Sequence, residues 1–221
     1  MRSLHHNLLV VGLLVAILCL VTRSQAQDTP GISAGAFFEN RTDSKVGGDE
    51  LSFNYYGVRF KVRAERYIEG FVDLGSQSID WQPYKASDAG SFGLGGIFWL
   101  LRSEDGVVPA DVGVYGSYHV ASYTLKTDAG TSTDAKYSRY MVQGIVRGFE
   151  GGVAHPYLRA GIMNSNLEPD DEQVISSDDL KTTKPAVNVG VDFNINESLV
   201  FGLEGNYSEG VGGAVHLDYW F

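Results

Sequence analysis

Strict alternation of apolar and charged side chains is the feature that most restricts how this chain can fold. In Tyr56–Ala64 every even position is apolar, and the odd positions include Arg59, Lys61 and Arg63. Successive side chains of a β-strand point to opposite faces, so this segment predicts a strand with one apolar and one cationic face. A soluble sandwich would bury the apolar face in its core, whereas a membrane barrel would turn that face toward lipid. Alternation alone leaves both alternatives open.

Strand-like segments recur at close spacing through the rest of the chain, and no amphipathic helix of convincing length follows residue 26. This pattern is typical of an all-β sandwich or barrel. The connections between segments broadly alternate between long and short, as in outer-membrane barrels. We expect about ten strands, with eight as the alternative because the first or fourth segment could be no strand. The expected strands are Ile32–Asn40, Tyr56–Ala64, Tyr67–Gln77, Ser91–Arg102, Asp111–Lys126, Tyr137–Phe149, Pro156–Leu167, Ala186–Ile195, Leu199–Tyr207 and Gly213–Phe221.

The N-terminal segment predicts secretion. Residues 8–21 form an unbroken apolar run, Arg2 precedes it, and Ser24–Ala26 supplies the small residues of a cleavage site. A transmembrane helix is the alternative, but it needs about 18 or more apolar residues. We therefore expect a cleaved signal peptide over 1–26 and one domain over 27–221. The only cysteine, Cys19, would leave with the signal peptide.

The final strand carries the most specific resemblance in the chain. One of its faces is wholly apolar and holds Val215, Leu217, Tyr219 and Phe221. A chain that ends on such a strand, with a terminal phenylalanine, resembles the small monomeric bacterial outer-membrane β-barrel family, which includes the outer-membrane protein A barrel and porin-like relatives. In that family the last strand closes the barrel and is recognised by the assembly machinery.

The resemblance covers the whole chain, and the signal peptide and the terminal Phe221 favour a membrane barrel over a soluble sandwich. It implies a transmembrane up-and-down antiparallel β-barrel in the bacterial outer membrane. Its implied partners are outer-membrane lipid and, through the C-terminal strand, the barrel assembly machinery. We expect no cofactor and no metal.

Charges of both signs lie on the faces expected to point into the barrel. A barrel of about eight strands has an interior just wide enough for side chains to fill, and an unpaired buried charge is costly. We therefore expect these charges to pair and plug the lumen, with a narrow charge-lined channel as the alternative. The residues are Arg59, Lys61, Arg63, Glu69, Asp73, Arg139, Arg147, Arg159, Asp192, Glu204 and Asp218.

Aromatic residues lie near the expected strand ends, where membrane barrels carry interfacial girdles. They are Tyr55, Tyr56, Tyr67, Trp81, Tyr84, Tyr219 and Trp220. We expect these side chains to face the membrane interfaces.

No motif for catalysis, cofactor binding or metal binding stands out. His119, His155 and His216 match no nucleophile or zinc pattern, and the acidic stretch 168–184 matches no calcium loop. The formal charge of −10, which becomes −12 once Arg2 and Arg23 are removed, argues against a nucleic-acid partner. We expect a structural or surface-interaction role. A narrow passive porin-like channel is the second candidate, and a barrel-embedded lipid-modifying enzyme or protease is the third.

Overall fold

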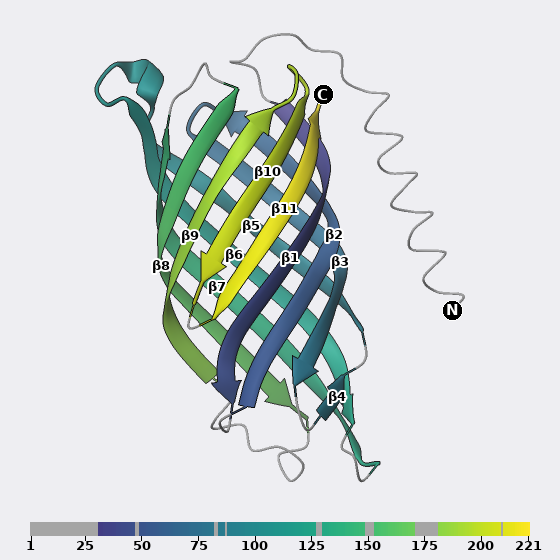
Figure 1. Ribbon diagram of the computed structural model, residues 1–221. Coiled ribbons are helices and arrows are strands. Elements are labelled where there is room, and N and C mark those ends of the chain that lie inside the picture. Colours follow the sequence, from purple (N-terminus) through teal and green to yellow (C-terminus); the bar gives the residue numbers. More distant parts are fainter. Residues whose placement is uncertain are drawn as a thin grey trace.

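A closed barrel of ten long antiparallel strands forms the described part of the chain (Figure 1). The computed structural model describes residues 31–221 except 47–48, 82–83, 87, 127–129, 149–152, 171–180 and 209. The barrel strands are β1 (Gly31–Val46), β2 (Asp49–Glu65), β3 (Ile68–Trp81), β5 (Ala89–Leu101), β6 (Ala110–Lys126), β7 (Ser132–Gly148), β8 (Ala154–Pro169), β9 (Lys181–Asn194), β10 (Leu199–Tyr207) and β11 (Val211–Trp220). The predicted all-β up-and-down antiparallel barrel is confirmed, with ten strands rather than eight.

Two short elements complete the described structure. β4 (Tyr84–Ala86) pairs with β3 and β6 at one end of the barrel, and η1 (Ser103–Asp105) is a single turn of 3-10 helix at the other end. Among the described residues, no helix is long and apolar enough to cross a membrane. The expected signal peptide lies outside the described residues.

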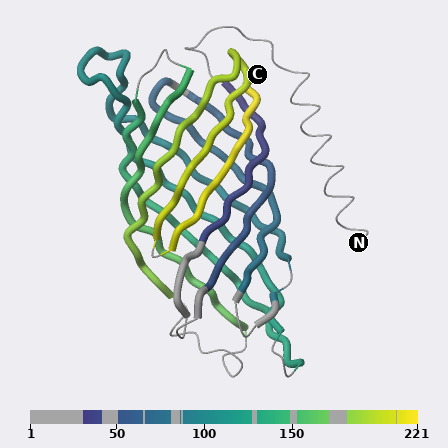
Figure 2. The backbone as a smooth tube through the Cα atoms, in the orientation of Figure 1, coloured from purple at the N-terminus to yellow at the C-terminus, as the bar shows by residue number. Residues whose placement is uncertain are grey.

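The first and last strands close the barrel. β1 pairs with β2 on one side and with β11 on the other, and Figure 2 shows the purple first strand beside the yellow last strand. Ser33 pairs with Trp220, and the Phe221 amide donates a 2.9 Å hydrogen bond to the Ile32 carbonyl. Both ends of the described chain therefore lie at one end of the barrel, which we call the termini end. The opposite end is the loop end.

An apolar belt surrounds the barrel on the termini side. On β7, for example, Tyr140, Val142 and Val146 are exposed on the outer face, whereas Gln143 and Ile145 are buried inside. The belt continues on every long strand, including exposed Leu94, Phe98, Leu158, Ile162, Val189, Leu203 and Leu217. The apolar face of each strand thus points away from the barrel, which is the reverse of a soluble barrel.

Toward the loop end the pattern inverts. On β6, Tyr123 and Leu125 are buried inside the barrel, and Ser122 and Lys126 are exposed outside. The inward side chains form one contiguous apolar cluster, which we call the loop-end cluster: Leu51, Phe53, Ile79, Ala89, Ala121, Tyr123, Leu125, Ala135, Tyr137 and Leu167. This section of the barrel, the loop-end extension, has an ordinary hydrophobic core.

The inversion explains where the predicted strand boundaries were wrong. β2 begins at Asp49 rather than Tyr56, β7 at Ser132 rather than Tyr137, and β9 at Lys181 rather than Ala186. The polar outer face of the extension made these residues look like long loops. On β2 and β7 they continue the ladder with inward side chains that pack in the loop-end cluster, namely Leu51, Phe53 and Ala135. The added residues of β9 make polar contacts instead, such as the 3.0 Å hydrogen bond between Thr182 and Ser165.

Candidate functional site in the barrel lumen

Each of the eleven charged residues assigned to the lumen from sequence lies near an opposite charge or a histidine. The pairs within 4.0 Å are Arg59–Asp73, Lys61–Asp218, Arg63–Glu69, Arg139–Glu39, Arg147–Glu69, Arg159–Glu204 and His216–Asp192. The last pair is ionic only when the imidazole is protonated. These pairs connect strands on all sides of the barrel, so the lumen holds an ion-pair network.

Near the termini end, Glu69 is shared by two cations. Its Oε1 lies 3.6 Å from Arg63 Nη2 and 3.8 Å from Arg147 Nη2, and it accepts a 2.9 Å hydrogen bond from Trp99 Nε1. Arg147 also donates a 3.0 Å hydrogen bond to Asp111, and its guanidinium lies 4.4 Å from the centre of the Trp99 ring. The charges at this end are thus held by both carboxylates and aromatic faces.

A fork-like ion pair follows deeper in the lumen. Arg59 Nε and Nη2 donate to the two oxygens of Asp73 at 2.6 and 2.7 Å, from directly opposite positions on β2 and β3. Charge-assisted bidentate pairs of this kind are among the strongest hydrogen bonds in proteins. The Arg59 guanidinium also lies 4.3 Å from the centre of the Phe71 ring. Asp73, which is fully buried, is therefore well satisfied.

A second pair passes over a glycine. Lys61 Nζ on β2 lies 2.5 Å from Asp218 Oδ2 on β11, and β1 lies between the two strands. Gly35 of β1 pairs with both Arg59 and Asp218. A Cβ atom at Gly35 would lie 2.2 Å from Asp218 Oδ1, so only glycine leaves room for this carboxylate.

Glu204 is the centre of a third group. It accepts hydrogen bonds from Tyr157 Oη at 2.8 Å and from Asn188 Nδ2 at 2.6 Å, and it is ion-paired with Arg159. Asn188 in turn accepts a 2.8 Å hydrogen bond from Gln143 Nε2. The group joins β7, β8, β9 and β10 by polar contacts inside the wall.

The deepest ion pairs include residues that the sequence analysis missed. Glu39 accepts hydrogen bonds from Arg139 at 3.3 and 3.4 Å and lies 3.0 Å from Arg41 Nε. Arg41 Nη1 also contacts the Met163 sulfur at 3.0 Å. Arg41 lies just beyond the expected end of the first strand, and the neighbouring Phe37 and Phe38 obscured which face was apolar. The odd-position series Ser33, Gly35, Phe37 and Glu39 was the available signal. Asp111 was missed similarly, at the first position of an expected strand.

The aromatic residues do not all lie where the girdle prediction placed them. Tyr56 and Tyr219 are exposed on the outer face, but Tyr55 is buried inside against Phe37, with ring centres 4.5 Å apart. Tyr55 shares the odd-numbered face of β2 with Arg59, so pleating turns it inward. The remaining positions are also different: Tyr67 contacts Asp105 in a turn, and Trp220 lies under Arg63. The structure does not describe the side chains of Trp81 and Tyr84.

The lumen cations nearest the loop end are the least exposed, although Arg147 and Arg102 near the termini end are also mostly buried, with 16% and 6% of their side chains exposed. The exposed fraction of the side chain is 30% for Arg63, 22% for Lys61, 11% for Arg159, 4% for Arg139 and 2% for Arg41. The loop-end cluster follows beyond Arg41 and Arg139. The lumen is therefore accessible from the termini end and filled toward the loop end.

The final strand has the two faces expected from its sequence. Val215, Leu217 and Tyr219 are exposed on the outside, and Asp218 is buried inside. The Phe221 ring packs edge-on against Tyr219 with a centroid distance of 5.1 Å. The apolar face therefore joins the outer belt at the termini end.

The three histidines that the structure describes form no recognisable catalytic arrangement. His216 Nε2 lies 3.3 Å from Asp192 and 3.4 Å from Asp218, His155 contacts Asn194, and His119 is buried beside Tyr55. Within the described ranges, no group of three or more histidine, cysteine or carboxylate side chains is arranged to hold a metal ion.

Comparison with known proteins identifies the architecture. No protein-family model matches the sequence, and no curated protein matches it. The translocator domain of the autotransporter NalP from Neisseria meningitidis has a similar structure, with a TM-score of 0.52 and 11% identity over 99% of this chain and 96% of that one. The chain has the fold of an outer-membrane β-barrel.

Two further structural neighbours are less similar. An outer membrane channel from Pseudomonas putida F1 gives a TM-score of 0.48 at 7% identity, covering 90% of this chain and 100% of the other. The outer membrane protein OprG from Pseudomonas aeruginosa gives 0.40 at 13% identity, covering 88% and 96%. At such low identities the likeness concerns the fold alone.

Proposed function

We propose that the protein is a monomeric outer-membrane barrel with a structural or surface-interaction role and a closed lumen. The outer belt supports membrane insertion. On β7 it extends from Gly148 to Tyr140, and the next outward residues toward the loop end, Ser138 and Lys136, are polar. This length matches the roughly 9–11 tilted residues with which a β-strand crosses a bilayer. The termini end would then face the periplasm, and the loop end would face the exterior.

The loop-end cluster is the observation that carries the closed lumen. It fills the barrel beyond the paired charges with apolar side chains, such as Tyr123, Leu125 and Tyr137. An ion that entered from the periplasmic side would meet charges that are already paired, and then a mostly apolar layer in which only a few polar side chains, such as Gln77 and Thr133, could replace its hydration shell. Both layers oppose conduction.

Conductance in planar bilayers tests this proposal. We expect wild-type protein to show little steady current, and Leu125→Ala/Tyr137→Ala to produce a leak because the apolar layer is opened. The matched control is Ser122→Ala/Lys136→Ala on the outer face of the same strands, which should remain silent. Large, stable wild-type currents would overturn the closed lumen and favour the porin-like channel.

We also propose that the C-terminal strand is recognised during assembly, after removal of a signal peptide. Phe221 lies at the outer termini rim beside Tyr219. Phe221→Asp should lower insertion in cells much more than it lowers spontaneous refolding into detergent. The control is Ile195→Asp, a charge at an exposed turn position of the same end. Equal pulse-labelled insertion of the two variants would contradict a recognition role. The proposed role uses no catalytic residue and no cofactor.

A further inference from the structure

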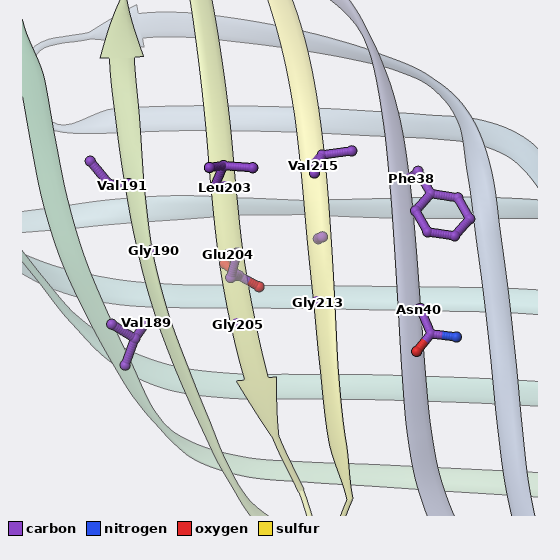
Figure 3. A pocket seen from close by; sticks show the side chains of 11 residues that line it. Phe38, Asn40, Val189, Gly190, Val191, Leu203, Glu204, Gly205, Gly213 and Val215 are labelled. Atoms are coloured by element: carbon purple, nitrogen blue, oxygen red, sulfur yellow. The ribbon is translucent and has the colours of Figure 1, made fainter.

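A depression of about 740 Å³ lies on the outside of the belt, across β9, β10, β11 and β1. Figure 3 shows its side walls: Val189, Val191 and Leu203 stand on one side, and Val215 and Phe38 stand on the other. Its volume falls in the range of about 300–1,000 Å³ that is usual for small-molecule sites. Unlike the lumen, it opens sideways, toward the surroundings of the belt.

Two adjacent glycines form the floor of the depression. Gly205 on β10 pairs directly with Gly213 on β11. An added Cβ at Gly205 would come no nearer than 3.9 Å to any other atom, and one at Gly213 would lie 3.3 Å from the Glu204 carbonyl oxygen. Neither glycine has positive φ. The contrast with Gly35 is clear, since there the fold itself excludes a side chain. At Gly205 a side chain would fit without a close contact, whereas at Gly213 it would crowd the Glu204 carbonyl oxygen; at both positions the missing side chain leaves the surface hollow.

The depression lies in the loop-end half of the belt, on the side of the barrel where the strands extend least far toward the loop end. The β10–β11 hairpin ends at Tyr207 and Val211, while β1 continues to Val46 (Figure 1). The lining includes two polar residues: Glu204, whose carboxylate is bonded to Tyr157 and Asn188 in the lumen, and Asn40 at this edge, which donates a 2.8 Å hydrogen bond to Asn54. Such a groove is apolar along its length and polar at the end nearest the exterior.

We infer that this groove binds one acyl chain of a membrane lipid in the outer leaflet. This inference rests on the proposed membrane insertion. An acyl chain has the required apolar chemistry, and a flexible chain can reach the glycine floor. A vacant hollow would forfeit dispersion contacts with its lining. A second barrel is too broad to enter, because its convex outer surface would touch the side walls of the groove before it reached the two glycines. The polar edge lies where the lipid headgroup would emerge.

Photo-crosslinking in vesicles tests the inference. The barrel is refolded into phosphatidylcholine vesicles containing a trace of the same lipid with a diazirine on one acyl chain, and the labelled residues are mapped by mass spectrometry. We expect at least fivefold more labelling per residue at the groove than over the rest of the belt. Gly205→Leu/Gly213→Leu should bring groove labelling down to the belt average.

The matched control is Gly144→Leu. Gly144 is also exposed, and an added Cβ there would meet only the Ala160 carbonyl oxygen, at 3.8 Å. This variant should label like the wild type. Uniform labelling of inserted wild-type protein would overturn lipid binding in the groove but leave the proposed membrane insertion intact. Crosslinks between two barrels through the groove would overturn it as well, because they would show that a second copy occupies the groove. Heat-dependent gel mobility in the same samples reports insertion. If no variant inserts, the membrane assignment falls and the groove proposal falls with it.

Discussion

The belt and the loop-end extension are made by the same strands but have opposite faces. In the belt section of β6, Val114 and Tyr118 are exposed on the outer face of the barrel, and His119 is buried on the inner face. A few residues further along the same strand, Tyr123 and Leu125 point inward and polar residues point outward. Pleating continues without interruption, so the change lies in the residue types and not in the backbone. The comparison shows that one continuous strand carries opposite residue types on the same two faces in the two sections.

The two sections also stabilise their interiors differently. The extension buries apolar area, which is favourable wherever the outside is water. The belt has polar groups inside and must compensate each one, because an uncompensated buried charge costs several kcal/mol. Glu69 and Glu204 each have two or more partners, and Asp73 accepts two hydrogen bonds from Arg59, which meets this requirement. The belt therefore depends on pairing, and the extension depends on packing.

The largest expected effect tests pairing inside the belt. Asp73→Leu should lower the free energy of unfolding by about 3–5 kcal/mol, because it leaves the Arg59 guanidinium without its carboxylate. Arg59→Met/Asp73→Leu should recover most of that loss, since neither charge remains. Urea titration in detergent micelles, followed by tryptophan fluorescence, measures both. A double variant as unstable as the single one would show that the charges matter for more than their mutual pairing.

The next effect tests packing in the extension. Leu125→Ala should cost about 3 kcal/mol because it leaves a cavity in the loop-end cluster. Lys126→Ala, its exposed neighbour, should cost less than about 0.5 kcal/mol. The same urea titration compares them. Similar losses from the two substitutions would mean that the extension is not packed around its interior.

The alternation within the belt was readable from sequence because apolar outward and polar inward side chains follow one consistent period. Tyr56–Ala64 therefore predicted both the strand and its faces. The strand segments of the extension could not be predicted, because their apolar side chains lie on the inner face instead of the outer one. Their polar outer residues, such as Ser52 and Asn54 on β2, resemble those of loops. Tyr55 was misplaced for the same reason.

The pairing partners in the lumen could not be predicted either. Arg139 meets Glu39, which is 100 residues away in the sequence, because strand order and register bring β7 and β1 to opposite walls of one barrel. Residue types gave the charges, but only the closed ladder determines which acid reaches which base. The outer groove depends on how far the β10–β11 hairpin extends along the barrel relative to its neighbours, and the local sequence of a strand does not show this.

A third prediction exchanges side chains between the two sections of β7. Val142→Lys, on the outer face of the belt, should cost about 2 kcal/mol when the barrel is folded in vesicles, because it places a charge in lipid. Lys136→Val, on the same face in the extension, should cost less than about 0.5 kcal/mol. Reversible unfolding from vesicles measures the difference. A comparable cost for the two changes would place the membrane boundary elsewhere.

The smallest effect compares two cross-strand pairs of similar geometry. Thr124 and Asp134 lie directly opposite each other on β6 and β7, as Arg59 and Asp73 do on β2 and β3. Thr124 Oγ1 donates a 2.8 Å hydrogen bond to Asp134, but this pair lies on the water-facing side of the extension. Water can replace the bond, so Asp134→Ala should lower the free energy of unfolding by only about 0.2–1 kcal/mol. The urea titration used for Asp73→Leu gives this value under identical conditions. A loss as large as that of Asp73→Leu would mean that the outer face of the extension is shielded from water, and the contrast between the two sections would then not hold.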